Sequence, residues 1–500
     1  MNSSSATITP VHGGFVTKPK NPIPMDKIRR VNPTEPVRLP LLNYHNEPVE
    51  ALVAVGDTVH IGSMLASNIV ASVSGVVSAI EHRHFIHPSG QTQRCVEIQP
   101  DHKNTITTLP PLDPNRLDSL TPYALVGLGG AAYPLFDKVQ TARNAGVSAL
   151  IINAVECEPL VDCDNALIQQ SADTCIQGIE LLMRLCHVEN ASIAIKASMQ
   201  RAIDALRQVL SLRTEKPASI ELQLVQDKYP AGAERTLIQT LNVSKNPLAE
   251  PPSHQGLLCI NIATAEALYH AYQGRPMTGR VISVTSPKGQ TQNIWAPFGT
   301  RIRDILDVCG QDRYDGRVVA GGPLSGQLVD DLQLPVSAST NSLLLQTPSE
   351  RADAQACIRC GDCATVCPSH LLPQQLYWYA QAEQVKTAVK FGLLECVECA
   401  CCDLVCPSSI PLTQLFRYTK HNHHQIRDEQ HRSEWAQQRF AEHQLRETER
   451  LSVKTSKKAA SNPLDRLKQQ RKKTTSSADG ATLKTHNSGE RVDKPQTPKP

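Results

Sequence analysis

Two cysteine runs in this chain have the spacing that cubane iron–sulfur clusters require. They are Cys357-x2-Cys360-x2-Cys363-x3-Cys367-Pro368 and Cys396-x2-Cys399-x2-Cys402-x3-Cys406-Pro407. In such runs three thiolates wrap one cluster, and the cysteine before the proline reaches the other cluster. The pattern therefore predicts two [4Fe-4S] clusters and a protein that transfers electrons. The expected ligands are Cys357, Cys360, Cys363 and Cys406 for one cluster, and Cys396, Cys399, Cys402 and Cys367 for the second.

Zinc is the alternative metal, because CxxC pairs also build tetrahedral zinc sites. Two overlapping runs of four cysteines, each closed by a proline, fit this alternative poorly. Cys401 lies off the ligand spacing, and we interpret it as a packing thiol. A zinc-dependent nucleic-acid protein would be colourless, whereas an iron–sulfur protein absorbs visible light.

Composition indicates a multidomain globular chain. Its 500 residues exceed the size of one domain, and the hydrophobic and charged shares, 40% and 20%, are ordinary. The sequence shows neither a signal peptide nor a membrane span, and sixteen cysteines without a disulfide-like framework favour a reducing compartment, so we expect a cytoplasmic protein. Residues 451–500 hold 12 Lys and Arg against 4 Asp and Glu, which predicts a disordered basic tail that solubilises the chain or binds an anionic membrane face.

Hydrophobic patterning divides the chain into modules. Short strands over 53–80 are typical of a lipoyl-like barrel sandwich, although Ser67–Val70 provides no lysine to carry a cofactor. Strands alternating with helices then predict a parallel, doubly wound sheet. The full expectation is an N-terminal extension (1–41), a barrel-sandwich hybrid module (42–105), a Rossmann-like flavin domain (115–270), a β-grasp, SLBB-like domain (277–345), a helical ferredoxin-type two-cluster domain (350–415), a polar helix (416–450) and the disordered tail (451–500).

The loops after the predicted parallel strands are candidates for a second cofactor site, because ligands of such sheets bind at the carboxyl ends of strands. These loops are Gly127–Lys138, Asn153–Pro159, Tyr229–Glu234 and Asn261–Thr264, the first following a strand expected over 121–129. The first loop contains Gly127, Gly129 and Gly130, which would let the backbone approach a phosphate, while Lys138 could reach it. Asn153 and Glu156 could bind a flavin ring or its ribityl hydroxyls. The competing interpretation is an ordinary tight turn beside a capped loop.

Several motifs together resemble one known family. In order they are His12-Gly13-Gly14, VGLGGAAYPLFDK (126–138), IINAVECEP (151–159), KYPAGAE (228–234), NIATA (261–265), GGPLSG (321–326) and both cysteine runs. Over about residues 12–420 the chain resembles RnfC, a component of the Rnf electron-transport complexes. Its middle part is also similar to the flavin-bearing, NADH-oxidising subunit of respiratory complex I.

The resemblance implies FMN in the α/β domain, NADH stacked on it and two [4Fe-4S] clusters. It implies flavin contacts at Gly127, Gly129, Gly130, Lys138, Asn153, Glu156, Tyr229, Asn261 and Thr264, with Glu158 and Glu234 nearest the nicotinamide nucleotide. It also implies a peripheral protein on the cytoplasmic face of a bacterial inner membrane, with membrane subunits of an ion-translocating complex, NADH and ferredoxin as partners and no nucleic acid. Two alternatives share this layout, a flavin-free two-cluster relay scaffold and a soluble reductase of the cobalamin type.

Overall fold

The computed structural model describes residues 8–16, 28–43, 47–86, 92–213, 219–243, 251–346, 353–460 and 463–474. The chain divides into two compact units, residues 1–421 and 422–500. All the described strands lie in the first unit, and so do all the residues that the sequence assigns to cofactor sites.

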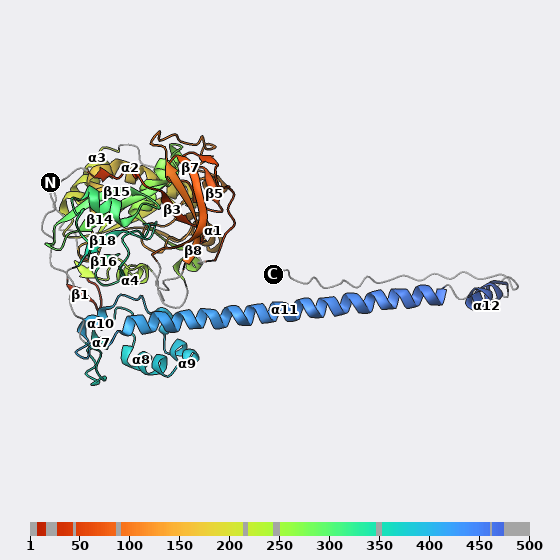
Figure 1. Cartoon of the computed structure of the whole chain (residues 1–500). Helices are drawn as coiled ribbons and strands as arrows, with labels where there is room; N and C mark the ends of the chain where they lie inside the picture. Colours follow the sequence, from red (N-terminus) through yellow and green to blue (C-terminus); the bar gives the residue numbers. More distant parts are fainter. Residues whose placement is uncertain are drawn as a thin grey trace, which may run out of the picture. The chain divides into compact units, whose positions relative to one another are not determined.

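The first module is a flattened barrel of antiparallel strands. Its main sheet has the order β3-β8-β7-β4, and β5 and β6 form a second, two-stranded sheet with its turn at Ser67 and Asn68. The long strands β7 and β8 pair along almost their whole length (Figure 1). Valine, leucine and isoleucine side chains from both sheets fill one core. The bounds are β3 Val37–Pro40, β4 Thr58–Val59, β5 Met64–Ala66, β6 Ile69–Val70, β7 Gly75–His84 and β8 Thr92–Pro100.

The second module is a parallel, doubly wound sheet in the order β11-β10-β9-β13. Both faces of β9 are buried, because Ile152 packs with α1, α2, α3 and α5 while Ile151 packs with α4. The strand order reverses between β9 and β13. The elements are η1 Leu117–Tyr123, α1 Leu135–Ala145, β9 Ala149–Ala154, α2 Cys163–Cys186, β10 Asn190–Lys196, α3 Gln200–Ser211, β11 Ser219–Val225, β12 Lys228–Tyr229, α4 Glu234–Thr240, η2 Pro252–Gln255, β13 Leu257–Asn261 and α5 Ile262–Tyr272.

One expected strand of this module does not form. The segment 121–129 was predicted to be extended, but η1 occupies its first residues and the rest is turn and loop. Pro122 lies inside η1 and cannot donate a ladder hydrogen bond, and Ala124 has a left-handed backbone (φ +49°) that interrupts a strand. The glycine loop therefore follows a short 3-10 helix rather than a strand.

The third module is a six-stranded mixed sheet that packs against one helix. Its order is β17-β16-β18-β14-β15-β2. Helix α6 buries Ile302, Ile305 and Leu306 against this sheet, as its amphipathic sequence predicts. The bounds are β14 Gly279–Thr285, β15 Thr291–Pro297, α6 Ile302–Val308, β16 Val318–Ala320, β17 Gln327–Val329 and β18 Ser342–Leu345.

The cysteine runs lie in a small helical module. Its core contains Leu376, Ala388, Leu393 and Phe416 together with several of the cysteines. The segment between the two runs is helical as predicted, in two pieces and a 3-10 turn. The elements are α7 Asp362–Thr365, α8 Pro373–Gln381, α9 Val385–Lys390, η3 Leu393–Glu395, α10 Cys401–Val405 and the first turns of α11 Leu412–Ala460.

The N-terminal segment is not the separate extension that the sequence suggested. Strand β1 (Phe15–Val16) pairs with β12, β2 (Arg29–Arg30) joins the third module at β15, and β3 pairs with β8 of the barrel. The expected boundary at residue 42 is therefore too late, because β3 already belongs to the barrel core. Residues 1–7 and 17–27 lie outside the described part of this segment.

The C-terminal region also differs from expectation. Residues 451–500 were predicted to be disordered, yet α11 continues to Ala460 and α12 covers Pro463–Thr474 (Figure 1). Glu, Gln, Arg, Lys and Ala dominate this region and have high helix propensity, so a helix can form without burying a core. Residues 475–500 lie outside the described part of the chain. Among the helices that the structure describes, none has an apolar stretch of the length that crossing a bilayer requires.

Candidate functional site

The structure gathers the eight cysteines around two cavities. Cys357, Cys360, Cys363 and Cys406 line one cavity, and we name them the outer set. Cys367, Cys396, Cys399 and Cys402 line the other, and we name them the inner set. Each set combines three cysteines of one run with the last cysteine of the other run. This is the crossed grouping that the spacing predicts.

The two runs have the same backbone plan. Residues two and four positions after the first cysteine have left-handed φ angles in both, at Arg359 and Gly361 in one run and at Glu398 and Ala400 in the other. Left-handed residues let the chain turn tightly, so three cysteines come to face one cavity. The third residue after each final cysteine, His370 and Ser409, is also left-handed. The cysteine domain is thus an internal repeat at the level of the backbone.

The inner set is deeply buried, and its environment suits thiolates only if positive charge is supplied. Burial raises the pKa of the Cys396 thiol to about 11, so this side chain stays protonated at neutral pH without a metal. Cluster iron would provide the charge that deprotonates such a thiol. Backbone N–H groups of Leu371 and Glu398 donate to the sulfurs of Cys367 and Cys396, at 3.3 and 3.4 Å. The cavities, ligand chemistry and N–H donors fit iron–sulfur clusters.

Cys401 also lines the inner cavity and is completely buried. It packs with Tyr229 and Cys399 in a small apolar cluster between modules. This position agrees with the interpretation of Cys401 as a packing thiol.

The expected flavin loops meet at the carboxyl ends of β9 and β13, where the strand order reverses. The Leu128 N–H, inside the glycine loop, donates to the Thr264 hydroxyl at 2.8 Å, and Thr264 is fully buried. A Cβ atom on Gly129 would lie 3.5 Å from the Asn261 side chain, whereas one on Gly130 would meet nothing within 4 Å. The structure therefore brings the glycine loop and the β13–α5 loop together.

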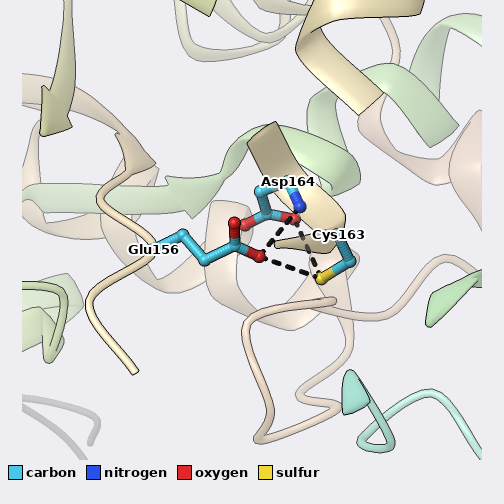
Figure 2. A group of neighbouring side chains, drawn as sticks. All are labelled: Glu156, Cys163 and Asp164. Atoms are coloured by element: carbon cyan, nitrogen blue, oxygen red, sulfur yellow. Dashed lines mark hydrogen bonds between the residues drawn. The ribbon is translucent and has the colours of Figure 1, made fainter. Parts of the chain in front are cut away.

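Glu156 caps helix α2 from a distance in sequence. Its Oε1 accepts the Asp164 N–H at 2.9 Å and its Oε2 accepts the Asn165 N–H at 3.3 Å. The Cys163 thiol donates to the same carboxylate at 3.2 Å, and Figure 2 shows the three side chains converging. Ligand atoms of Glu156, Cys163 and Asp164 lie within 4.8 Å of one another. Since N–H groups of α2 already occupy both Glu156 oxygens, the arrangement is a helix cap rather than a metal site.

The same buried group extends to the neighbouring loop. Asp164 accepts a hydrogen bond from the Asn261 amide at 2.6 Å. Burial, and then the Glu156 carboxylate, raise the pKa of Asp164 to about 7. Arg280, from β14, places a guanidinium nitrogen 4.0 Å from the Cys163 sulfur. Sequence reasoning missed Cys163, Asp164 and Arg280, and the acidic Asp162-Cys163-Asp164 start of α2 was the available signal.

Lys138 and Asn153 are engaged within the protein. The Lys138 ammonium pairs with Glu234 at 2.9 Å and donates to the Cys259 carbonyl at 2.7 Å. The Asn153 amide donates to the Gly232 carbonyl at 2.8 Å. These bonds link β9, α1 and α4 at one end of the sheet. A flavin or nucleotide phosphate at Lys138 would have to compete with Glu234.

Tyr229 and Glu158 lie at the contacts with the other modules. The Tyr229 hydroxyl donates to the backbone carbonyl of Cys399 at 2.8 Å. Glu158 accepts the N–H groups of Leu324 and Ser325 at 2.8 and 3.0 Å, in the GGPLSG loop of the third module. Burial raises the pKa of Glu158. These two residues therefore connect the α/β module to the cysteine domain and to the third module, respectively.

Comparison with known proteins gives three matches to family models. Residues 11–103 match the RnfC barrel sandwich hybrid domain, residues 120–270 the Nuo51 FMN-binding domain, and residues 356–410 a 4Fe-4S dicluster domain. The chain is 35% identical over 387 residues to the RnfC protein of the ion-translocating oxidoreductase complex from Pasteurella multocida, which covers 73% of this chain and 46% of the relative. The chain is a homologue of RnfC. The expected resemblance is confirmed.

A second RnfC relative, from Haemophilus influenzae, is 34% identical over 82% of this chain and 65% of its own length. The chain spans about half the length of most of the curated relatives that it matches. One chain of an NAD+-reducing [NiFe]-hydrogenase is similar over 55% of this chain and 54% of its own, at 19% identity and a TM-score of 0.43, which is too weak to carry an argument. The matches support flavin and iron–sulfur clusters as cofactors.

Proposed function

We propose that this chain is the RnfC-type electron-transfer component of an ion-translocating oxidoreductase complex, passing electrons between NAD(H), FMN and two [4Fe-4S] clusters. The observation that carries the proposal is the crossed grouping of eight cysteines around two cavities, in the same compact unit as a sheet of the FMN-binding type. Zinc needs no such crossed grouping. The homologues support a partnership with the membrane subunits of such a complex.

The cofactors and the chain have separate tasks in this proposal. A flavin accepts a hydride as an electron pair and releases electrons singly, which suits one-electron clusters. Gly127, Gly129 and Gly130 would let backbone amides approach the flavin phosphate, at the carboxyl ends of β9 and β13. The inner and outer cysteine sets would hold one cluster each and shield it from water. No side chain is required as a general acid or nucleophile.

Further parts of the proposal follow from the resemblance. NADH would bind on the flavin near Glu158 and Glu234, and ferredoxin would be a redox partner of the assembled complex. The chain would lie on the cytoplasmic face of a bacterial inner membrane as a peripheral protein. Hydrogen bonds from Lys138 and Asn153 to protein groups are the observation that favours the flavin-free relay as the second candidate function.

An anaerobic NADH titration of the full chain separates these two functions. Flavin absorbance, cluster absorbance and electron paramagnetic resonance would be recorded on the same samples. Bleaching of both chromophores by NADH supports the proposed function. Clusters that dithionite reduces while NADH does not, in a protein that retains no flavin after reconstitution, would establish the relay. Colourless protein with bound zinc would contradict both.

A further inference from the structure

Tyr229 ties the α/β module to the inner cysteine set. The side chain is 3% exposed, and its hydroxyl donates to the carbonyl of Cys399 at 2.8 Å. Around it, Cys157, Leu324 and Phe15 pack with Cys399 and residues next to the inner set. Three modules and the N-terminal strand β1 therefore meet at one cysteine ligand. The Cys399 carbonyl is fixed by a group that belongs to the flavin-type domain.

The N-terminal segment closes the same junction. The Gly14 N–H donates to the Val366 carbonyl at 2.8 Å, next to Cys367 of the inner set, and β1 pairs Phe15 with Tyr229. A Cβ atom on Gly13 would lie 2.8 Å from the Cys367 backbone. His12 stacks on His370, with ring centroids 3.8 Å apart. A segment far away in the sequence thus holds the inner set and β12 in contact.

The outer set has a different environment. Cys360 is exposed, whereas Cys367, Cys399 and Cys402 of the inner set are buried. Ile358, between the first two outer cysteines, is 68% exposed. The outer cavity is lined only by residues 357–412, all within the cysteine domain or the start of α11. It has no counterpart, among the described residues, to the Tyr229 bond.

From this asymmetry we propose an order for the two clusters, which rests on the proposed function. The inner set holds the cluster that exchanges electrons with the flavin domain, and Tyr229 is the positioning residue that fixes its ligand Cys399 against that domain. The outer set holds the cluster that exchanges electrons with a partner protein. Each step moves one electron and neither forms nor breaks a bond, so the two electrons of one hydride need two passages through the inner and outer sets.

Tyr229→Phe tests the positioning role in the full chain. The hydroxyl dipole points its positive end toward Cys399, and such dipoles raise the reduction potential of a nearby cluster. We expect the variant to keep its iron content and to show a lower midpoint potential for one cluster signal. Tyr123→Phe is the matched control, because Tyr123 is also buried and donates to a backbone carbonyl, that of Pro110, at 2.8 Å. Its two cluster potentials should be unchanged.

One outcome would return Tyr229 to the flavin site. If Tyr229→Phe loses flavin while both cluster potentials stay at their original values, the hydroxyl serves the flavin and not the inner set. Equal shifts in both cluster signals would also overturn the positioning role.

The order of the clusters is tested by removing one at a time. In Cys360→Ser, NADH should still reduce the remaining inner cluster. In Cys396→Ser, dithionite should reduce the remaining outer cluster, but reduction by NADH should be lost. The opposite pattern would overturn the order.

A measurement on the unmodified protein keeps this test independent of folding and of flavin. A soluble paramagnetic dysprosium complex should enhance the spin relaxation of the outer cluster signal, the signal missing in Cys360→Ser, more than that of the inner one. Equal enhancement would overturn the proposed exposure of the outer set. If NADH reduces neither cluster in the unmodified protein, the proposed function fails, while the relaxation result still decides which cluster faces solvent.

Discussion

Gly14→Ala should destabilise the junction between β1, β12 and the cysteine domain. Gly14 has a left-handed backbone, with φ at +63°. An added Cβ atom would lie 1.9 Å from the Tyr229 carbonyl oxygen and 2.9 Å from its carbonyl carbon. Both are backbone atoms, so they cannot rotate away as a side chain would. The new methyl group can be accommodated only if β1 moves away from β12.

The expected cost has two parts. An alanine in the left-handed region costs about 1 kcal/mol more than glycine. Forcing an extra methyl into a packed contact typically costs a further 1 to 3 kcal/mol, roughly. The sum is about 2 to 4 kcal/mol. Gly310→Ala is the matched control, because Gly310 has a similar φ of +71° but a Cβ atom there would meet nothing within 4 Å. It should lose about 1 kcal/mol, the backbone part alone.

Urea denaturation of both variants and the parent chain provides the assay. Tryptophan fluorescence would follow the polypeptide, and visible absorbance would follow loss of the clusters. A chain of several modules need not unfold in one step, so the comparison concerns the transition that releases the clusters. We expect Gly14→Ala to lower that midpoint clearly more than Gly310→Ala does. Equal midpoints for the two variants would show that residue 14 is not confined between β12 and the cysteine domain.

Three further predictions concern the cofactor sites. Cys360→Ser should remove one cluster signal from the resonance spectrum and about half of the iron, and equal loss of both signals would contradict separate ligand sets. Lys138→Ala should lower flavin retention without changing iron content, and unchanged flavin content would remove Lys138 from the site. The raised pKa of Asp164 means that the folded protein keeps a proton which the unfolded chain releases above pH 3.8. This stabilising contribution is lost as pH rises from about 4 to about 7, so Asp164→Asn should weaken that pH dependence of urea stability, and an unaltered dependence would show that Asp164 is ionised throughout.

The sequence was informative where the determining contacts are local. Ligand spacing follows from three cysteines within seven residues, so the crossed grouping could be predicted without knowing the fold. Helix α2 was expected over residues 165–186 from its apolar period and was found at Cys163–Cys186. The parallel sheet followed from the alternation of strands and helices. In each case a pattern within one segment decides the structure.

Long-range contacts could not be read in the same way. His12-Gly13-Gly14 was recognised as a motif, but nothing near it in sequence shows that it contacts Val366 and Cys367. Tyr229 was assigned to the flavin, whereas its hydroxyl bonds to Cys399, 170 residues later. The strand expected over 121–129 failed because local apolar composition was given more weight than Pro122. The helix over 451–460 was missed because a basic composition was taken to exclude regular structure.

The bonds at the sheet edge suggest how the flavin-type site would work. Thr264 holds the glycine loop through Leu128, and Asp164 holds Asn261 of the adjacent loop. Glu156 in turn fixes the first turn of α2, which contains Asp164. Side chains that were expected to touch a flavin therefore brace the loops against one another, and preorganised loops lose less entropy when a ligand binds. This leaves the backbone amides of the glycine loop as the donors that we expect to face the cofactor, because a Cβ atom on Gly130 would enter open space.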